Sequence, residues 1–490
     1  MPTRPNILWY CSDQQRFDTI GALGNPHIHS PNLDRFAGES AVFTHAYCQS
    51  PICTPSRASF LTGMYPSAVG VNGNGFQTFP QHYAERLLPR RLREVGYDCG
   101  LVGKLHLASA FLRREERVDD GYEYFQYSHD HKGGNERGNE YVEWLKAQGI
   151  DPDSILQRRE IASLDDYRRA GTQAGFGGLS VPTPQNDNVP PHLHQTHWCT
   201  DKAIEFIKRN READKPWLLS INPFDPHPPF DAPWEYYRRY DPQQLPGAHV
   251  HEGDLAHQRR LEAAGIDFQT RAQHPDSSPH KEIQAAYYAM IEFIDDEFGR
   301  LLDYLDAAGL RENTIVIYMS DHGEMLGDHG LFLKGCRFYE GLARVPLMIS
   351  WRGQILPQQS DALIELVDIA PTLYELLGIE TPAWLQGRSV ADGLRVGVDK
   401  HRDFARCEYY AATNYPDETH ATMYRDRRWK LVVYHQKQIC ELFDLEADPW
   451  ERHDLSADPA YADIKWDLLQ RSFDSSIYAH PAQTDRYGPF

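Results

Sequence analysis

Four short apolar runs along the chain each end in polar or charged residues. They have the length of strands and are bounded by residues typical of loops. The runs cover residues 6–10, 100–103, 217–221 and 314–319. The polar residues that follow them are Asp13-Gln14, Lys104 with His106, Asp225 with His227, and Asp321-His322. The pattern predicts four strands with candidate site residues at their ends.

Helical patterns lie between these runs. They cover residues 83–95, 200–210 and 281–308, the last with apolar residues at helical spacing. Alternating strands and helices predict an α/β fold, in which a large, mostly parallel sheet is sandwiched by helices. Ligands bind such sheets outside the carboxyl ends of the strands. The prediction therefore brings Asp13, Lys104, His227 and Asp321 to one edge of the sheet.

The pattern changes after about Gly378. Residues 427–435 and 439–445 resemble an antiparallel hairpin, and residues 460–473 a last helix before a polar, aromatic tail. We expect a catalytic domain over residues 1–380 and a smaller α+β subdomain over 381–490. The tail after Phe473 is predicted to contribute to a homo-oligomer. Residues 151–191, rich in Gly and Pro, are interpreted as an insertion at the rim of the site.

Composition narrows the classes of partner. The chain has 490 residues, 41% of them hydrophobic, which is ample for a large core. It carries 50 Lys and Arg against 70 Asp and Glu, a formal charge of −20, without a basic run. Nucleic acid is therefore not expected as a partner. An anionic substrate would need a local cluster of cations or a metal ion.

The eight cysteines are scattered and form no Cys-x-x-Cys pair, which argues against zinc-ribbon and redox motifs. The apolar run near the N-terminus, residues 7–10, is too short for a signal-peptide core or a membrane span. We expect no membrane association, and a cytoplasmic protein with reduced thiols.

Cys53 is the first candidate nucleophile. It opens Cys53-Thr54-Pro55-Ser56-Arg57, where an irregular segment gives way to a helix-like run. A helix N-terminus and a nearby arginine lower the pKa of a thiol and favour anions. Read alone, the motif is compatible with a thiolate nucleophile that uses His106 or His227 as its base. That hypothesis leaves the acidic residues at the strand ends unexplained.

Asp13, Gln14, Asp321 and His322 would supply oxygen ligands and one imidazole, a set that suits calcium, magnesium or manganese. Chemistry on a tetrahedral anion also needs cations and proton carriers. Arg57, Lys104 and Lys334 are the candidate cations. His106 and His227 are the candidate proton carriers, because a histidine pKa of about 6.5 lies near neutrality.

Taken together, these motifs resemble the type I sulfatases of the alkaline phosphatase superfamily over nearly the whole chain. An ordered series of this kind is specific, although each motif alone is weak. The matching segments are 5–7 with 12–16, 30–35, 53–57 with 61–63, 103–106, 226–230, 320–324 with 327–330, 334–335, and 441–445 with 448–449. The resemblance implies an alkaline-phosphatase-like fold and the hydrolysis of sulfate monoesters.

The resemblance also implies a role for each site residue. Cys53 would be oxidised to formylglycine by a formylglycine-generating enzyme, and its hydrated aldehyde would be the nucleophile, with Arg57 stabilising it. One divalent cation, with calcium as the first candidate, would bind to Asp13, Gln14, Asp321, His322 and modified Cys53. Lys104 and Lys334 would bind sulfate oxygens. His227, with Lys334, would assist the leaving alcohol, and His106 would be the base that allows sulfate to leave.

The chain departs from the common family pattern at two positions. Many members have Asp where this chain has Gln14, and Asn where it has His322. The related phosphonate monoester hydrolases share Gln and His there, so a phosphonate or phosphodiester hydrolase with promiscuous sulfatase activity is the alternative. Lys104 and His106 keep the sulfatase form, which favours sulfate esters. A binding module without chemistry is disfavoured, because neither the nucleophile nor the carboxylates at 13 and 321 are missing.

Overall fold

The computed structural model describes residues 4–110, 114–129, 138–156, 189–213, 215–266, 268–413 and 418–479. An eight-stranded sheet runs through its centre in the order β10-β2-β9-β7-β1-β6-β4-β5. Its strands are β1 Asn6–Ser12, β2 Ala41–Phe43, β4 Asp98–Gly103, β5 Tyr124–Tyr127, β6 Trp217–Asn222, β7 Thr314–Ser320, β9 Leu347–Ser350 and β10 Gln358–Ser360. Strand β9 runs antiparallel to both of its neighbours, whereas the strands from β7 to β5 are all parallel. The four predicted strands are confirmed as β1, β4, β6 and β7.

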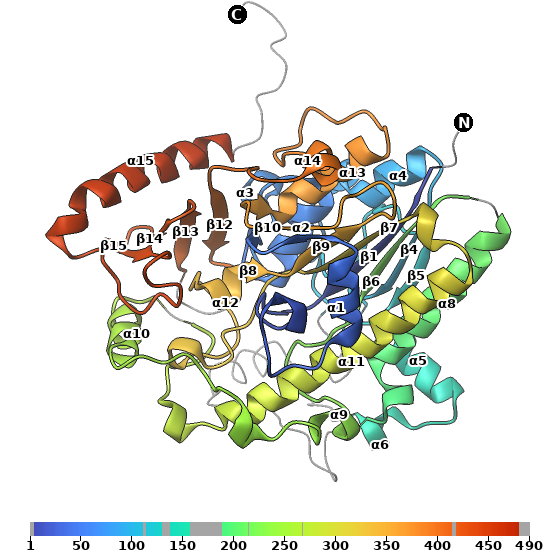
Figure 1. The fold of residues 1–490 in the computed structure, drawn as a ribbon, viewed down its shortest axis with the longest axis horizontal. Helices are drawn as coiled ribbons and strands as arrows, with labels where there is room; N and C mark the ends of the chain where they lie inside the picture. Colours follow the sequence, from blue (N-terminus) through green and yellow to red (C-terminus); the bar gives the residue numbers. More distant parts are fainter. Residues whose placement is uncertain are drawn as a thin grey trace, which may run out of the picture.

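Helices cover both faces of this sheet (Figure 1). On one face, Ile7 and Trp9 of β1 pack in a core with α2, α4 and α13. On the other face, Leu8 and Tyr10 pack in a core with α1, α8 and α11. The alternate residues of one strand thus serve two cores, which explains why residues 7–11 are all apolar. The helices are α1 Pro31–Gly38, α2 Cys53–Thr62, α3 Pro66–Val69, α4 Leu88–Glu94, α5 Glu140–Ala147, α6 Pro152–Ile155, α8 Gln195–Ala213, α9 Trp234–Tyr237, α10 Asp254–Ala263, α11 His280–Ala307, α12 Glu340–Ala343, α13 Ile369–Leu376 and α14 Ala391–Val396.

The helix predicted over residues 83–95 is wrong in part. A 3-10 helix covers Gln81–Arg86, Leu87 is extended, and α4 begins at Leu88. Pro89 explains the break, because proline lacks an amide N–H and its ring clashes with the preceding turn unless it lies at a helix start. The helices predicted near residues 200–210 and 281–308 are confirmed as parts of α8 and as α11.

The C-terminal part carries an antiparallel sheet with helix α15, Ala462–Tyr478, packed on it (Figure 1). Its strands are β12 Ala405–Tyr410, β13 His420–Arg425, β14 Trp429–Tyr434 and β15 Ile439–Asp444, and they pair in sequence order. The predicted hairpin is confirmed as β14 and β15. A third sheet joins β11 Ile364–Glu365, β3 Ala46–Tyr47 and β8 Arg344–Val345.

The last helix is longer than predicted. Helix α15 spans Ala462–Tyr478, so residues 474–478 are helical and are not part of an irregular tail. Ser475 contributes to this extension, because its hydroxyl accepts a hydrogen bond of 3.1 Å from Arg406. Residues 480–490 lie outside the described residues, as does most of the insertion predicted at 151–191. None of the helices in the described part of the chain is long and apolar enough to cross a membrane.

Candidate active site

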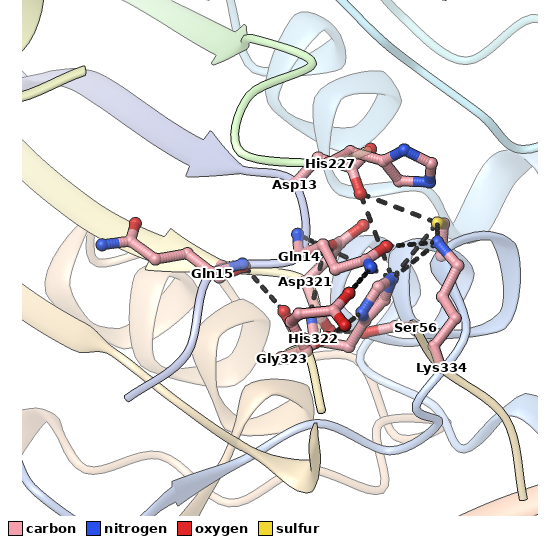
Figure 2. Close-up of polar contacts among 12 residues, drawn as sticks. Asp13, Gln14, Gln15, Ser56, His227, Asp321, His322, Gly323 and Lys334 are labelled. Carbon is pink, nitrogen blue, oxygen red and sulfur yellow. Dashed lines mark hydrogen bonds and ion pairs between the residues drawn. The ribbon is translucent and has the colours of Figure 1, made fainter. Parts of the chain in front are cut away.

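The site lies at the carboxyl edge of the parallel strands, as predicted. Asp13 follows β1, Lys104 follows β4 and Asp321 follows β7, while Cys53 is the first residue of α2. Figure 2 shows the side chains of Asp13, His227, Asp321, His322 and Lys334 converging on one site. Asp13, His322 and Lys334 contact the Cys53 sulfur there. Residues hundreds of positions apart in the sequence therefore meet in one buried cluster.

Asp13, Cys53, Asp321 and His322 could together hold a metal ion. Their ligand atoms lie within 4.8 Å of one another, and all four residues are buried. The sulfur lies 3.2 Å from His322 Nε2 and 3.7 Å from Asp13 Oδ1. His322 Nδ1 lies 2.9 Å from the Gly323 carbonyl, which accepts only from a protonated nitrogen and so leaves Nε2 available as a ligand. Two carboxylates and one imidazole fit a hard divalent cation.

Gln14 lies in this cluster with its side chain fully buried. Its backbone is in the left-handed region, with φ of 70°, and its amide N–H donates to Asp321 Oδ1 over 3.0 Å. The side-chain oxygen accepts a hydrogen bond of 2.8 Å from Lys334 Nζ, and Nε2 donates to Glu324. Non-glycine residues with positive φ are uncommon and cluster at functional sites.

Two lysines surround the sulfur. Lys334 Nζ lies 2.9 Å and Lys104 Nζ 3.7 Å from Cys53 Sγ, and Lys104 also pairs with Asp13. Burial and the Asp13 carboxylate raise the pKa of Cys53, but Lys104, Lys334 and His322 outweigh them and lower it to about 7. Anionic groups are therefore stabilised at this position.

Arg57 connects several parts of the site. Its Nε donates to Asp321 Oδ2 over 2.9 Å, and Nη1 donates to the Lys104 carbonyl over 3.0 Å. Nη2 lies 3.5 Å from Asp13 Oδ2. These contacts fix the two carboxylates relative to each other, in addition to any role of Arg57 toward a modified Cys53.

The two candidate proton carriers are both held near the cations. The backbone N–H groups of His106 and Leu107 donate to the two oxygens of Glu115, over 2.8 and 3.0 Å. His227 Nδ1 lies 2.6 Å from the Pro228 carbonyl. Burial lowers the pKa of both imidazoles well below the usual value for histidine. The next largest cause is the positive charge of Lys104 for His106 and of Lys334 for His227. Both rings are therefore neutral near pH 7.

Sequence reasoning missed the contacts that several supporting residues make. Glu324 and Glu115 hold Gln14 and His106, and the side chain of Asn74 accepts a hydrogen bond of 3.0 Å from the Thr54 N–H. Asn74 therefore caps the helix that begins at Cys53. The Thr54 N–H is occupied by this cap, and Pro55 has no N–H. The start of α2 therefore offers an anion fewer backbone N–H donors than a helix N-terminus usually does. Glu324 had a sequence signal, because it directly follows Asp321-His322-Gly323.

The sulfatase family model matches residues 5–379, which is more than half of the chain. The chain belongs to the sulfatase family. The members of this family are hydrolases that act on sulfate esters. A second model, described as N-sulphoglucosamine sulphohydrolase, C-terminal, matches residues 327–476 of this sulfatase.

Relatives of this sulfatase match along almost their whole length. An arylsulfatase of Clostridium perfringens (strain 13 / Type A) is 31% identical over 92% of this chain and 90% of its own. The multifunctional alkaline phosphatase superfamily protein PehA of Trinickia caryophylli is 30% identical over 96% and 95%. The crystal structure of a phosphonate monoester hydrolase of Agrobacterium radiobacter superposes with a TM-score of 0.77 at 25% identity, over 98% and 96%. The fold is therefore alkaline-phosphatase-like, as the resemblance implied.

Proposed function

We propose that this protein is an arylsulfatase-type enzyme that cleaves sulfate monoesters into inorganic sulfate and an alcohol or phenol. The observation that carries the proposal is the position of Cys53 at the start of α2. Its sulfur lies 2.9 Å from Lys334 Nζ and 3.2 Å from His322 Nε2, beside two buried carboxylates. Such a site combines a nucleophile position, cations for a tetrahedral anion and ligands for a metal ion.

We infer that Cys53 is converted to formylglycine by a formylglycine-generating enzyme, because it opens the Cys53–Arg57 motif. The hydrated aldehyde would supply the attacking hydroxyl. All five residues of the motif are buried, and Cys53, Thr54, Ser56 and Arg57 are at most 1% exposed. A modifying enzyme would thus need to reach the motif before α2 packs into the core.

The site is proposed to bind one divalent cation, with calcium as the first candidate and manganese or magnesium as alternatives. The ligands of this cation would be Asp13, Asp321, His322, Gln14 Oε1 and the residue at position 53. A cation there would act as a Lewis acid toward an oxygen at position 53. Removal of the ion with a chelator should lower the thermal unfolding temperature, and metal analysis after re-addition of each ion identifies the native one.

The remaining roles follow from charge and position. Lys104 and Lys334 would bind sulfate oxygens, since both ammonium groups face the Cys53 sulfur. His106 is neutral and can accept a proton, which suits the base that allows sulfate to leave. His227, with Lys334, would assist the leaving alcohol. Since His227 Nδ1 donates to the Pro228 carbonyl, Nε2 must gain a proton before it can act as an acid.

The decisive experiment compares kcat/KM for an aryl sulfate and an aryl phosphonate monoester that share one leaving group. The mass of the Cys53 peptide must first confirm formylglycine. We expect preference for the sulfate, and loss of turnover in a folded Cys53→Ala variant. Preference for the phosphonate would contradict the sulfatase proposal.

The second candidate is a phosphonate monoester hydrolase or phosphodiesterase with promiscuous sulfatase activity. Gln14 and His322 favour it, as does the similarity to the Agrobacterium radiobacter phosphonate monoester hydrolase. Retention of Lys104 and His106 in the sulfatase form favours the sulfatase. The same comparison of two esters decides between them.

We further propose a homo-oligomer built partly by the tail after Phe473, next to the exposed apolar side chains of α15, in a reducing, cytoplasmic environment. Trp466, Phe473 and Ile477 of this helix are 63%, 68% and 54% exposed, and the eight cysteines are free thiols. Truncation after Phe473 should reduce the size of the particle in solution. An unchanged size would contradict this assembly.

A further inference from the structure

Gln14 lies between a carboxylate and an ammonium group. Its side-chain Nε2 donates to Glu324 Oε2, and its Oε1 accepts from Lys334 Nζ over 2.8 Å. Lys334 Nζ then lies 2.9 Å from the Cys53 sulfur. Gln14 and Glu324 are fully buried, and Lys334 is 5% exposed. The three side chains thus form a continuous buried chain from Glu324 to the nucleophile position. Figure 2 shows Gln14 and Lys334, its two middle members, side by side.

The partners determine which way the Gln14 amide points. An ionised carboxylate only accepts hydrogen bonds, and an ammonium group only donates them. A reversed amide would place its NH₂ group against Lys334 and its oxygen against Glu324, so both contacts would be repulsive. The Gln14 oxygen therefore faces the Lys334 ammonium group because Glu324 holds the nitrogen.

Glu324 is itself fixed to the segment that carries Lys334. Its Oε1 accepts hydrogen bonds from the backbone N–H groups of Leu333 and, over 3.1 Å, Leu326. The Met325 N–H also donates to the Leu333 carbonyl over 3.1 Å, which closes the loop from 325 to 333. One carboxylate thereby orders both the loop before Lys334 and the amide that Lys334 contacts.

We propose that Glu324 is a positioning residue that orients Gln14 and, through it, holds Lys334 beside the nucleophile. The role of Lys334 in this statement rests on the proposed function. A carboxylate at position 14 would meet Glu324 at hydrogen-bond distance in a buried site, where two like charges are costly. Gln14 and Glu324 are thus a matched pair: the amide at 14 is required by the carboxylate at 324.

An exchange of the two groups tests this pairing. Gln14→Glu sets two carboxylates against each other, and Glu324→Gln removes the acceptor that orients the amide. In the double variant Gln14→Glu/Glu324→Gln, the amide at 324 can donate to the carboxylate at 14. Its oxygen can still accept from Leu326 and Leu333, while the new carboxylate accepts from Lys334. Every donor again has an acceptor.

We expect each single change to lower kcat/KM for an aryl sulfate about tenfold or more, and the double variant to recover at least about tenfold over Gln14→Glu. Thermal unfolding and metal content, measured on the same variants, should show the same recovery. As a matched control, Asp295→Asn removes another buried carboxylate, which caps residues 32 and 33 of α1. Combined with Gln14→Glu, it should give no recovery.

Two results would overturn the inference. The first is a double variant whose loss of activity is the product of the losses in the two single variants. The second is a Glu324→Gln protein that matches the wild type in all readouts. The failure of the proposed function would look different. In that case, wild-type protein carrying formylglycine would not hydrolyse the aryl sulfate, while the unfolding temperatures of the four proteins would still report whether residues 14 and 324 are coupled.

Discussion

The Glu115 carboxylate accepts the backbone N–H of His106 over 2.8 Å, and that of the following residue over 3.0 Å. His106 needs this support because its backbone is in the left-handed region, with φ of 56°. Glu115→Gln would turn an NH₂ group toward one of these N–H donors. An unsatisfied buried donor costs about 1–3 kcal/mol. We expect kcat to fall about tenfold with little change in KM, and the exposed neighbour Glu116→Gln serves as the control.

Glu115 also predicts a dependence of stability on pH. Burial raises its pKa from 4.5 to about 7, although its backbone hydrogen bonds oppose the change. The folded state thus binds the proton more tightly than the unfolded state. The resulting stabilisation is complete below pH 4.5 and is lost as the pH rises through 7, an effect on the order of 3 kcal/mol.

Urea unfolding of the wild type and Glu115→Gln between pH 5 and 8 measures this effect. The free energy of unfolding of the variant should rise relative to that of the wild type as the pH increases, because the amide does not ionise. A difference that stays constant over this range would contradict the assignment.

Lys430 joins the C-terminal sheet to the segment beyond Lys334. Its fully buried ammonium lies 2.7 Å from Glu340 of α12 and 2.7 Å from Glu451. Lys430→Met would leave these carboxylates without their shared cation, and breaking a buried pair costs about 3–5 kcal/mol. The exposed Arg427–Asp361 pair is the matched control, since Arg427→Ala should change the free energy of unfolding by less than about 1 kcal/mol. Equal losses in the two variants would contradict this account.

Much of the fold could be predicted because its strands are marked by continuous apolar runs. β1 supplies side chains to two cores, so residues 7–11 are all apolar and the strand is easily recognised, although it continues to Ser12, beyond the predicted run 6–10. The residues after it and after β7 were therefore assigned to one edge from the parallel topology alone. The break before α4 was missed because apolar spacing continues across Leu87, whereas Pro89 decides where the helix can start.

The supporting residues of the site could not be predicted in this way. Asn74 caps α2 from a loop 20 residues away, and Glu115 reaches back to His106 from an irregular segment. Neither contact has a periodic signal, since each depends on the path of a loop. Gln14 and Glu324 are 310 positions apart, so their pairing follows only from the adjacency of β1 and β7.

His227→Ala provides the sharpest test of the leaving-group assignment. A proton donor matters most when the departing alcohol is a poor leaving group, because more negative charge then develops on its oxygen. We expect kcat/KM to fall about 100-fold or more for an alkyl sulfate, but less than about tenfold for an activated aryl sulfate. His29→Ala, at an exposed histidine whose Nδ1 lies 3.1 Å from Glu292, is the control. Equal losses on both esters would instead assign His227 to binding the sulfate group, because that contact is common to the two substrates.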